Sequence, residues 1–285
     1  MFCAIIIPHT YDYLGGMLMY KTIGEIKREA SAALSGRRGI YILMLTVSAA
    51  LTSVFSMTGL LSLVASLFTV ILQVGMYSFL LKLCCGQKEQ AQFNDLFYAF
   101  KAQNGQAGKA IIIYLLQVLY ILPAAIIYII LLVVFIVTGA NGINDFNAID
   151  TLVFSSGYFL FALATLIAFF IYCLYISITY VMSFFVLLDY PELTGRQVWK
   201  RASQLIKGNR LRYIGLEFSY ILWLIIPIGM LVAGSVLTSP LLILLSSALT
   251  ILFTLWIIPS MNCAQAIFYL DLVQHYSKPV GPDIY

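Results

Sequence analysis

The chain has 285 residues, of which 62% are hydrophobic and only 10% are charged, and its mean hydropathy is +0.96. A soluble globular domain is about half apolar and about a quarter charged. The composition therefore excludes a water-soluble fold. The formal net charge is +4 at pH 7, but the positions of the basic residues carry more information than this sum.

The first 18 residues lack the basic start and the small-residue cleavage site of a secretory signal peptide. Leu14, Gly15 and Gly16 can be encoded by a ribosome-binding sequence just ahead of Met19. We therefore expect translation to start at Met19, and we interpret residues 1–18 as a non-native or disordered extension. The expected organisation is a single membrane domain over 19–272 followed by a cytoplasmic tail over 273–285.

Four long stretches of the chain contain no Asp, Glu, Lys or Arg. They cover residues 39–81, 110–144, 151–188 and 218–270. One helical crossing of a bilayer needs about 20 apolar residues. The first and last stretches can hold two crossings each, and the middle two suit one long or tilted helix each. The sequence predicts an all-α polytopic membrane protein with six transmembrane helices arranged as three hairpins.

The segments ahead of the first, third and fifth predicted spans share one pattern, which indicates an internal repeat. In each, a short amphipathic helix is followed by a glycine, by basic residues and by a span. The turn residues are Gly36, Gly105, Gly208 and Asn209. Glycine just past a helix end favours a left-handed cap, which turns the chain from the membrane surface into the bilayer. The predicted units cover about 20–85, 91–188 and 191–272, each a cytoplasmic surface helix followed by a hairpin.

The apolar side chains of each surface helix fall on one face. These stripes are Ile23, Ile26, Ala30 and Ala33 in the first helix, Phe93, Leu96, Phe97 and Phe100 in the second, and Val198, Ala202 and Leu205 in the third. Flanking Lys and Arg side chains favour an anionic inner leaflet. The residues predicted to contact lipid or the inner surface are Arg37, Arg38, Lys109, Lys200, Arg201, Lys207, Arg210 and Arg212.

The threading follows from the basic residues, all 16 of which lie in four segments. These segments precede span one, separate spans two and three, separate spans four and five, and form the tail. With six spans the four segments share one side of the membrane, and the positive-inside rule makes that side the cytoplasm. The sequence thus predicts a multi-pass protein with both termini cytoplasmic.

Two kinds of residue suggest a site within the membrane. Pro123 and Pro227 lie at nearly equal distances beyond Gly105 and Gly208, and Pro259 lies in the last span. Broken helices at matching repeat positions point to a transporter site, although proline is also common in spans for packing reasons. Glu217 is costly at membrane depth without a partner. Because it follows Arg212 by about 7.5 Å of helix rise, we favour a structural anchor paired with an arginine over a functional acid.

The remaining polar residues predict no catalytic chemistry. The two histidines, His9 and His275, lie in the terminal segments, and the five cysteines form no CxxC pair. Interhelical hydrogen bonds adequately explain the uncharged polar residues within the spans, which are Gln73, Gln117, Asn262 and Gln265. We expect no enzyme activity, no cofactor, no metal site and no nucleic-acid partner.

The order of these elements resembles the bacterial membrane family catalogued as domain of unknown function 975. The resemblance covers roughly residues 21–272. Its marks are Asp189 with Pro191, the Lys207, Gly208 and Asn209 turn, and Pro259 followed by Phe268 and Tyr269. The first turn departs from the family pattern, because Gly36 is followed by Arg37 and Arg38. The resemblance implies the plasma membrane of a Gram-positive-type bacterium and no known biochemical activity.

Two functions remain open from the sequence. In the first, the protein is a non-enzymatic membrane component that binds anionic inner-leaflet lipid or another membrane protein. In the second, it is a small permease or exporter subunit for a lipophilic or neutral compound, with a site near Pro123, Pro227, Pro259 and Glu217.

Overall fold

The computed structural model describes residues 20–56, 61–101, 105–141, 156–236 and 240–276. These residues form ten α-helices and two 3₁₀ turns, with no strand among them. Residues 1–18, which we expect to be an extension, lie outside the described residues. The last helix runs to Tyr276, so the predicted tail begins as a continuation of that helix.

The first surface helix, α1 (Ile23–Leu34), forms where it was expected. Thr22 caps its first turn, because its hydroxyl accepts a hydrogen bond from the Glu25 N–H at 3.3 Å and the Glu25 carboxylate accepts the Thr22 N–H at 2.7 Å. The helix buries Ile26, Ala30 and Leu34. This apolar stripe packs mainly on α11 of the same chain, so protein rather than lipid covers it.

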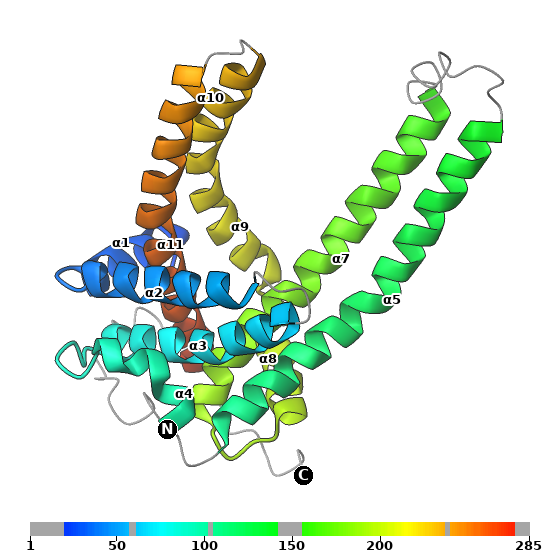
Figure 1. Ribbon diagram of the computed structural model, residues 1–285. Helices are drawn as coiled ribbons and strands as arrows, with labels where there is room; N and C mark the ends of the chain where they lie inside the picture. The colour runs from blue at the N-terminus through cyan, green and yellow to red at the C-terminus, as the bar shows by residue number, and fades with distance from the viewer. Residues whose placement is uncertain (1–19, 57–60, 102–104, 142–155, 237–239, 277–285) are drawn as a thin grey trace.

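The first helix pair consists of α2 (Arg38–Ser56) and α3 (Leu61–Cys84). The two helices pack on one another. In Figure 1 they run across the view, whereas the other long helices rise from the base. Much of α3 is buried inside the protein, including Leu72, Phe79 and Leu80. This helix contacts α2, α5, α7 and α11 and so lies at the centre of the packing.

The second surface segment differs from the expected amphipathic α-helix. Its first turn is a 3₁₀ helix, η1 (Phe93–Phe97), followed by the short α4 (Tyr98–Lys101). The Asp95 carboxylate holds this turn, since it accepts the Gln92 N–H at 3.0 Å and pairs with Lys82 of α3 at 2.5 Å. Of the predicted stripe Leu96 is buried, while Phe100 is 49% exposed.

The second hairpin is long and largely exposed. It is formed by α5 (Gln106–Asn141) and α7 (Ser156–Asp189), which pack against one another. Their outer halves carry exposed Leu, Ile, Val and Phe side chains, as expected for helices that face lipid. The next helix, α8 (Gly195–Leu205), packs back against the base of α5 and α7.

The third hairpin contains a broken helix. Its incoming arm is α9 (Arg210–Ile221), the 3₁₀ turn η3 (Leu222–Leu224) and α10 (Ile225–Val236), and its outgoing arm is α11 (Pro240–Tyr276). α10 packs so closely on α11 that a Cβ added at Gly234 would lie 3.1 Å from the Ile243 nitrogen. Small residues permit such close approach of membrane helices. In Figure 1 this hairpin and the α5–α7 hairpin diverge from a common base.

An aromatic core fills that base. Tyr77 of α3 packs on Phe184 and Phe185 of α7, with ring centroids 5.5 and 4.7 Å apart, and Phe185 stacks on Tyr269 of α11 at 5.3 Å. The Tyr269 hydroxyl donates to Asp189 at 2.7 Å. The basal ends of three helices that are distant in sequence are thereby fixed together.

Four helices are long and apolar enough to cross a bilayer: Val64–Cys84, Gln106–Val134, Leu160–Asp189 and Pro240–His275. The pair α9 and α10, bent by 50°, would add a fifth if it counts as one span, and Arg38–Val54 is a shorter apolar helix. The all-helical, membrane-like character expected from composition is thus confirmed. Helix length and composition do not by themselves confirm the six-span hairpin topology.

Candidate functional site

The exposed side of α8 is basic. Its apolar side chains Val198, Trp199, Ala202 and Leu205 are buried, which leaves Arg196 and Lys200 exposed, with Lys207 just beyond the helix end. We call Arg196, Lys200 and Lys207 the α8 basic face. Arg201 is also exposed, with its guanidinium 3.9 Å from the Tyr190 ring centroid. Because the protein covers the apolar stripe, only charge is available here for a headgroup.

Several other basic residues predicted to contact lipid have partners within the chain. Arg38 donates to the Ser260 hydroxyl at 3.0 Å and its guanidinium lies 3.9 Å from the Trp256 ring centroid. The guanidinium of Arg210 lies 3.4 Å from the Tyr175 ring centroid. These arrangements are typical of cation–π contacts, and they join elements of different predicted repeats.

Two further basic residues hold the base together. Lys109 at the start of α5 donates to the carbonyl of Pro191. Arg212 forms an ion pair with Asp271 at 2.6 Å, in which the Asp271 side chain is 1% exposed. Arg212 also donates to the carbonyl of Lys21. Breaking one partner of such a buried pair is strongly destabilising, so Arg212 has a structural role.

Lys27 on α1 also faces the third hairpin. Its ammonium donates to the carbonyl of Ser219 at 3.0 Å and lies 4.6 Å from the Tyr220 ring centroid. Burial lowers the pKa of Lys27, because it disfavours the charged form. This lysine therefore ties α1 to α9.

The turn glycines have the left-handed conformation that their position requires. The φ angles are +79° at Gly36, +63° at Gly105 and +88° at Gly208. Gly36 lies two residues past the end of α1, Gly208 lies three residues past the end of α8, and Asn209 directly precedes α9. A side chain would be strained at such φ values. The structure thus gives these glycines a turning role.

The three prolines differ in their effect on the helices. Pro123 and Pro259 lie inside the continuous helices α5 and α11. Pro227 instead lies in the first turn of α10, immediately after η3. Because proline has no N–H, Pro227 cannot donate a hydrogen bond to the carbonyl of Trp223 four residues earlier. Trp223 lies in η3, where the helix is interrupted.

Glu217 does not pair with an arginine, so the expected partner of this residue was wrong. Its carboxylate accepts a hydrogen bond of 2.7 Å from the side-chain amide of Gln265 on α11, and the Tyr213 side chain also interacts with it. Among the described residues no cationic side chain is paired with Glu217. Arg212, the expected partner, is paired with Asp271.

Glu217 and Gln265 line a cavity of about 300 Å³. Most of its wall comes from one face of α7 and one face of α9. The lining residues are Phe170, Leu174, Ser177, Ile178 and Val181 of α7, Tyr213, Ile214, Glu217, Phe218 and Ile221 of α9, and Gln265 of α11. The cavity therefore lies where the second predicted repeat meets the third, beside the break in the α9–α10 arm. The prolines do not line it.

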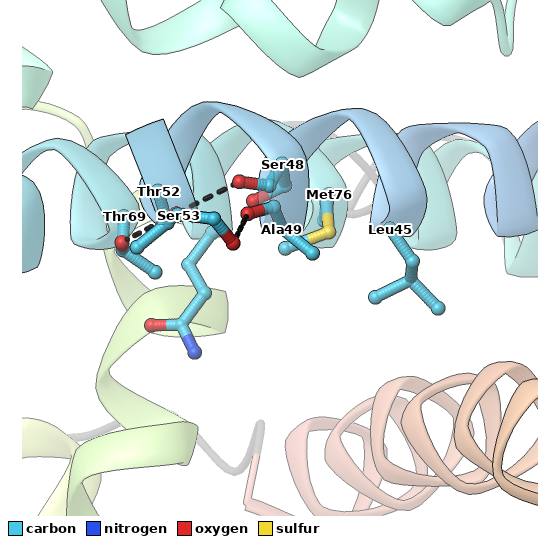
Figure 2. A pocket seen from close by; sticks show the side chains of 8 residues that line it. Leu45, Ser48, Ala49, Thr52, Ser53, Thr69 and Met76 are labelled. Carbon is cyan, nitrogen blue, oxygen red and sulfur yellow. Dashed lines mark hydrogen bonds between the residues drawn. The ribbon is translucent and has the colours of Figure 1, made fainter. Parts of the chain in front are cut away.

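A second, more open pocket of about 650 Å³ lies between α2 and α3. Figure 2 shows small hydroxyl side chains on its wall, where Thr52 donates to the Ser48 carbonyl at 2.7 Å and bonds to the Thr69 hydroxyl at 3.1 Å. The Gln73 carbonyl oxygen accepts from Tyr180 at 3.2 Å. The Thr52 and Thr69 hydroxyl groups of this pocket are therefore engaged in hydrogen bonds within the protein.

Sequence reasoning correctly expected Gln73, Asn262 and Gln265 to form interhelical hydrogen bonds, since Asn262 also donates to Tyr41 at 2.8 Å. It missed the combination of Gln265 with Glu217, because the two residues are distant in sequence.

A comparison with protein-family models matches residues 17–276 to the family described as protein of unknown function (DUF975). No curated protein matches the chain, and no solved structure does so either. Within the described residues no group of three or more His, Cys, Asp or Glu side chains could hold a metal ion.

Proposed function

Because the matched model covers most of the chain, the protein belongs to this family of unknown function, and we propose that it is a non-enzymatic plasma-membrane protein of bacteria that binds anionic inner-leaflet lipid. The observation that carries this proposal is the α8 basic face, whose side chains are exposed while the apolar side of the same helix is buried in the protein. Lipid contact is then electrostatic and needs no insertion of α8.

The geometry around α8 supports this assignment. The helix packs on the base of α5 and α7, both of which have candidate membrane-spanning segments, so its charges lie beside the inner ends of those spans. A Lys or Arg near an anionic surface contributes about 1 kcal/mol. The exposed outer halves of α5 and α7 leave a surface for lateral association with another membrane protein as well.

The experiment compares lipid retention by the full chain and by a variant carrying Arg196→Gln, Lys200→Gln and Lys207→Gln. Purified protein in neutral mixed micelles is titrated with phosphatidylglycerol, and bound lipid is counted by native mass spectrometry. We expect about tenfold weaker binding in the variant after screening by salt. The matched control is Gln204→Ala, which changes an exposed side chain of α8 without changing charge. Equal lipid binding by the triple variant and the native chain would refute the proposal.

A second function, that of a small permease or exporter subunit, is favoured by the broken arm of the third hairpin. The interruption between α9 and α10 lies beside the cavity that contains Glu217. Discontinuous helices at a repeat interface form the substrate sites of many transporters. Flux of a lipophilic compound into proteoliposomes, lost on Pro227→Ala and retained on Pro123→Ala, would favour this function over the first.

A further inference from the structure

The cavity between α7 and α9 has walls of two kinds. On α7 its residues recur at positions 170, 174, 177, 178 and 181, and on α9 at 213, 214, 217, 218 and 221. These spacings of three and four residues place each set on one helix face. Most of the side chains are aliphatic or aromatic, and the polar ones are Ser177, Tyr213, Glu217 and Gln265.

Two polar groups of this site lack a partner of the required kind. The Glu217 carboxylate has no cation paired with it among the described residues, and the Gln265 side-chain oxygen has no hydrogen-bond donor. A carboxylate only accepts hydrogen bonds, so the Gln265 amide must present its nitrogen to Glu217, as the 2.7 Å bond shows. The Gln265 oxygen then points away from Glu217. Gln265 is 4% exposed and this oxygen has no hydrogen-bond partner. Buried acceptors without donors are uncommon in folded proteins, and Gln265 is one of the residues that line the cavity.

A ligand that completes this site must bring a positive charge and more than one N–H donor. An ammonium group does both, since it has up to three donors for the Glu217 carboxylate and the Gln265 oxygen. A bare metal ion fits less well, because about 300 Å³ of mainly apolar cavity greatly exceeds the space that an ion needs. We propose that this cavity binds a protonated primary amine with a compact apolar body, held by Glu217 and Gln265.

This assignment does not depend on lipid binding at the α8 basic face. The two sites share no residue, and their ligands have opposite charge. An experiment in neutral lipid therefore tests the cavity alone.

The test uses the full chain in phosphatidylcholine nanodiscs with phenethylamine as the probe, measured by equilibrium dialysis at pH 7 with empty nanodiscs subtracted. We expect saturable binding by the native protein and a loss of about tenfold or more in affinity for Glu217→Gln, which removes the charge but keeps the shape. The matched control is Glu192→Gln, because Glu192 is an exposed acid outside the cavity. 2-Phenylethanol, which has the same apolar body without the charge, should bind at least about tenfold more weakly.

A second variant keeps the carboxylate and fills the cavity. Leu174→Trp should also abolish phenethylamine binding, and it decides the matter if Glu217→Gln does not yield a monodisperse protein. Binding that survives in Glu217→Gln or Leu174→Trp would overturn the proposal, as would equal binding of 2-phenylethanol. Displacement of the amine by sodium but not by choline at equal ionic strength would overturn it too, because it would assign the site to a small inorganic cation.

Discussion

At the scale of single residues, Gly75 is a position where α3 packs directly against the neighbouring backbone. A Cβ at this position would lie 2.2 Å from the carbonyl oxygen of Leu96 and 2.5 Å from that of Asp95. Both atoms belong to the main chain of η1, so the clash cannot be relieved by a side-chain rotation. The absence of a side chain at Gly75 therefore allows η1 to lie against α3.

We expect Gly75→Ala to destabilise the protein by about 1–3 kcal/mol, the usual cost of overpacking. The apparent melting temperature in detergent, followed by size-exclusion chromatography after heating, measures this effect. Gly108→Ala is the matched control, because nothing lies within 4 Å of its added Cβ and alanine is the better helix former. Equal melting temperatures for Gly75→Ala and the native chain would show that η1 moves away freely.

The same scale shows the limit of sequence reasoning about charged residues. The inward turn at Gly36 and the amphipathic stripe at Ile26 follow from local spacing, so both could be predicted. The pairing of Arg212 with Asp271 joins residues far apart in the chain. Periodicity contains no information about which acid an arginine reaches, and Glu217 was therefore given the wrong partner.

At the scale of elements, the interruption at η3 distinguishes the α9–α10 arm from α5 and α11. The two halves of the arm are bent by 50°, and Pro227 removes the hydrogen bond that would join them. Pro259 also lacks a backbone N–H, but α11 continues through this residue without a break. Whether Pro227 causes the bend can be measured directly.

Pro227→Ala should straighten the arm, because the new N–H can bond to the carbonyl of Trp223. Spin labels at Leu211→Cys and Val236→Cys, both exposed positions, should then move apart by about 3–4 Å in a pulsed electron resonance measurement. The native cysteines are replaced first, and Pro259→Ala in the same labelled background should leave the distance unchanged. An unchanged distance in Pro227→Ala would mean that packing of α10 on α11 sets the bend.

The positions of the helices were largely predictable from the sequence, but the packing partners of their apolar faces were not. Apolar stripes placed α1 and α8 correctly, because a period near 3.6 residues identifies a helix face. The stripes do not say what covers that face, and the protein's own helices cover it. η1 was missed as a 3₁₀ turn because the Asp95 contacts with Gln92 and Lys82 override the local pattern.

At the scale of the whole molecule, the basic residues and the hairpins constrain one another. α10 and α11 form a hairpin, so if α11 crosses the membrane the α9–α10 arm must cross as well, returning Asp271 to the side of Arg210. The same argument applies to α2 and α3. If α3 crosses the membrane, then α2 must cross as well to keep Arg38 on the side of Lys82. The 19 residues of α2 rise about 28 Å along the helix axis, which is close to the hydrocarbon thickness of a bilayer.

The orientation of α2 and α3 in Figure 1, across the view rather than along the other hairpins, makes this first pair the decisive case. A crossing pair and a pair lying along the inner surface predict opposite positions for the turn between them. Thr58, in that turn, lies outside the described residues, but a cysteine placed there reports its side of the membrane.

We expect Thr58→Cys to react with a membrane-impermeant maleimide added to intact cells, in a background without native cysteines. Asn147→Cys, in the long loop between the second pair of predicted spans and also outside the described residues, should react in the same way. Arg196→Cys should react only after the membrane is opened, since it belongs to the α8 basic face. Protection of Thr58→Cys with labelling of Asn147→Cys would reduce the spans to four, with α2 and α3 on the inner surface. Labelling of Arg196→Cys from outside would reverse the orientation and remove the α8 basic face from the cytoplasm.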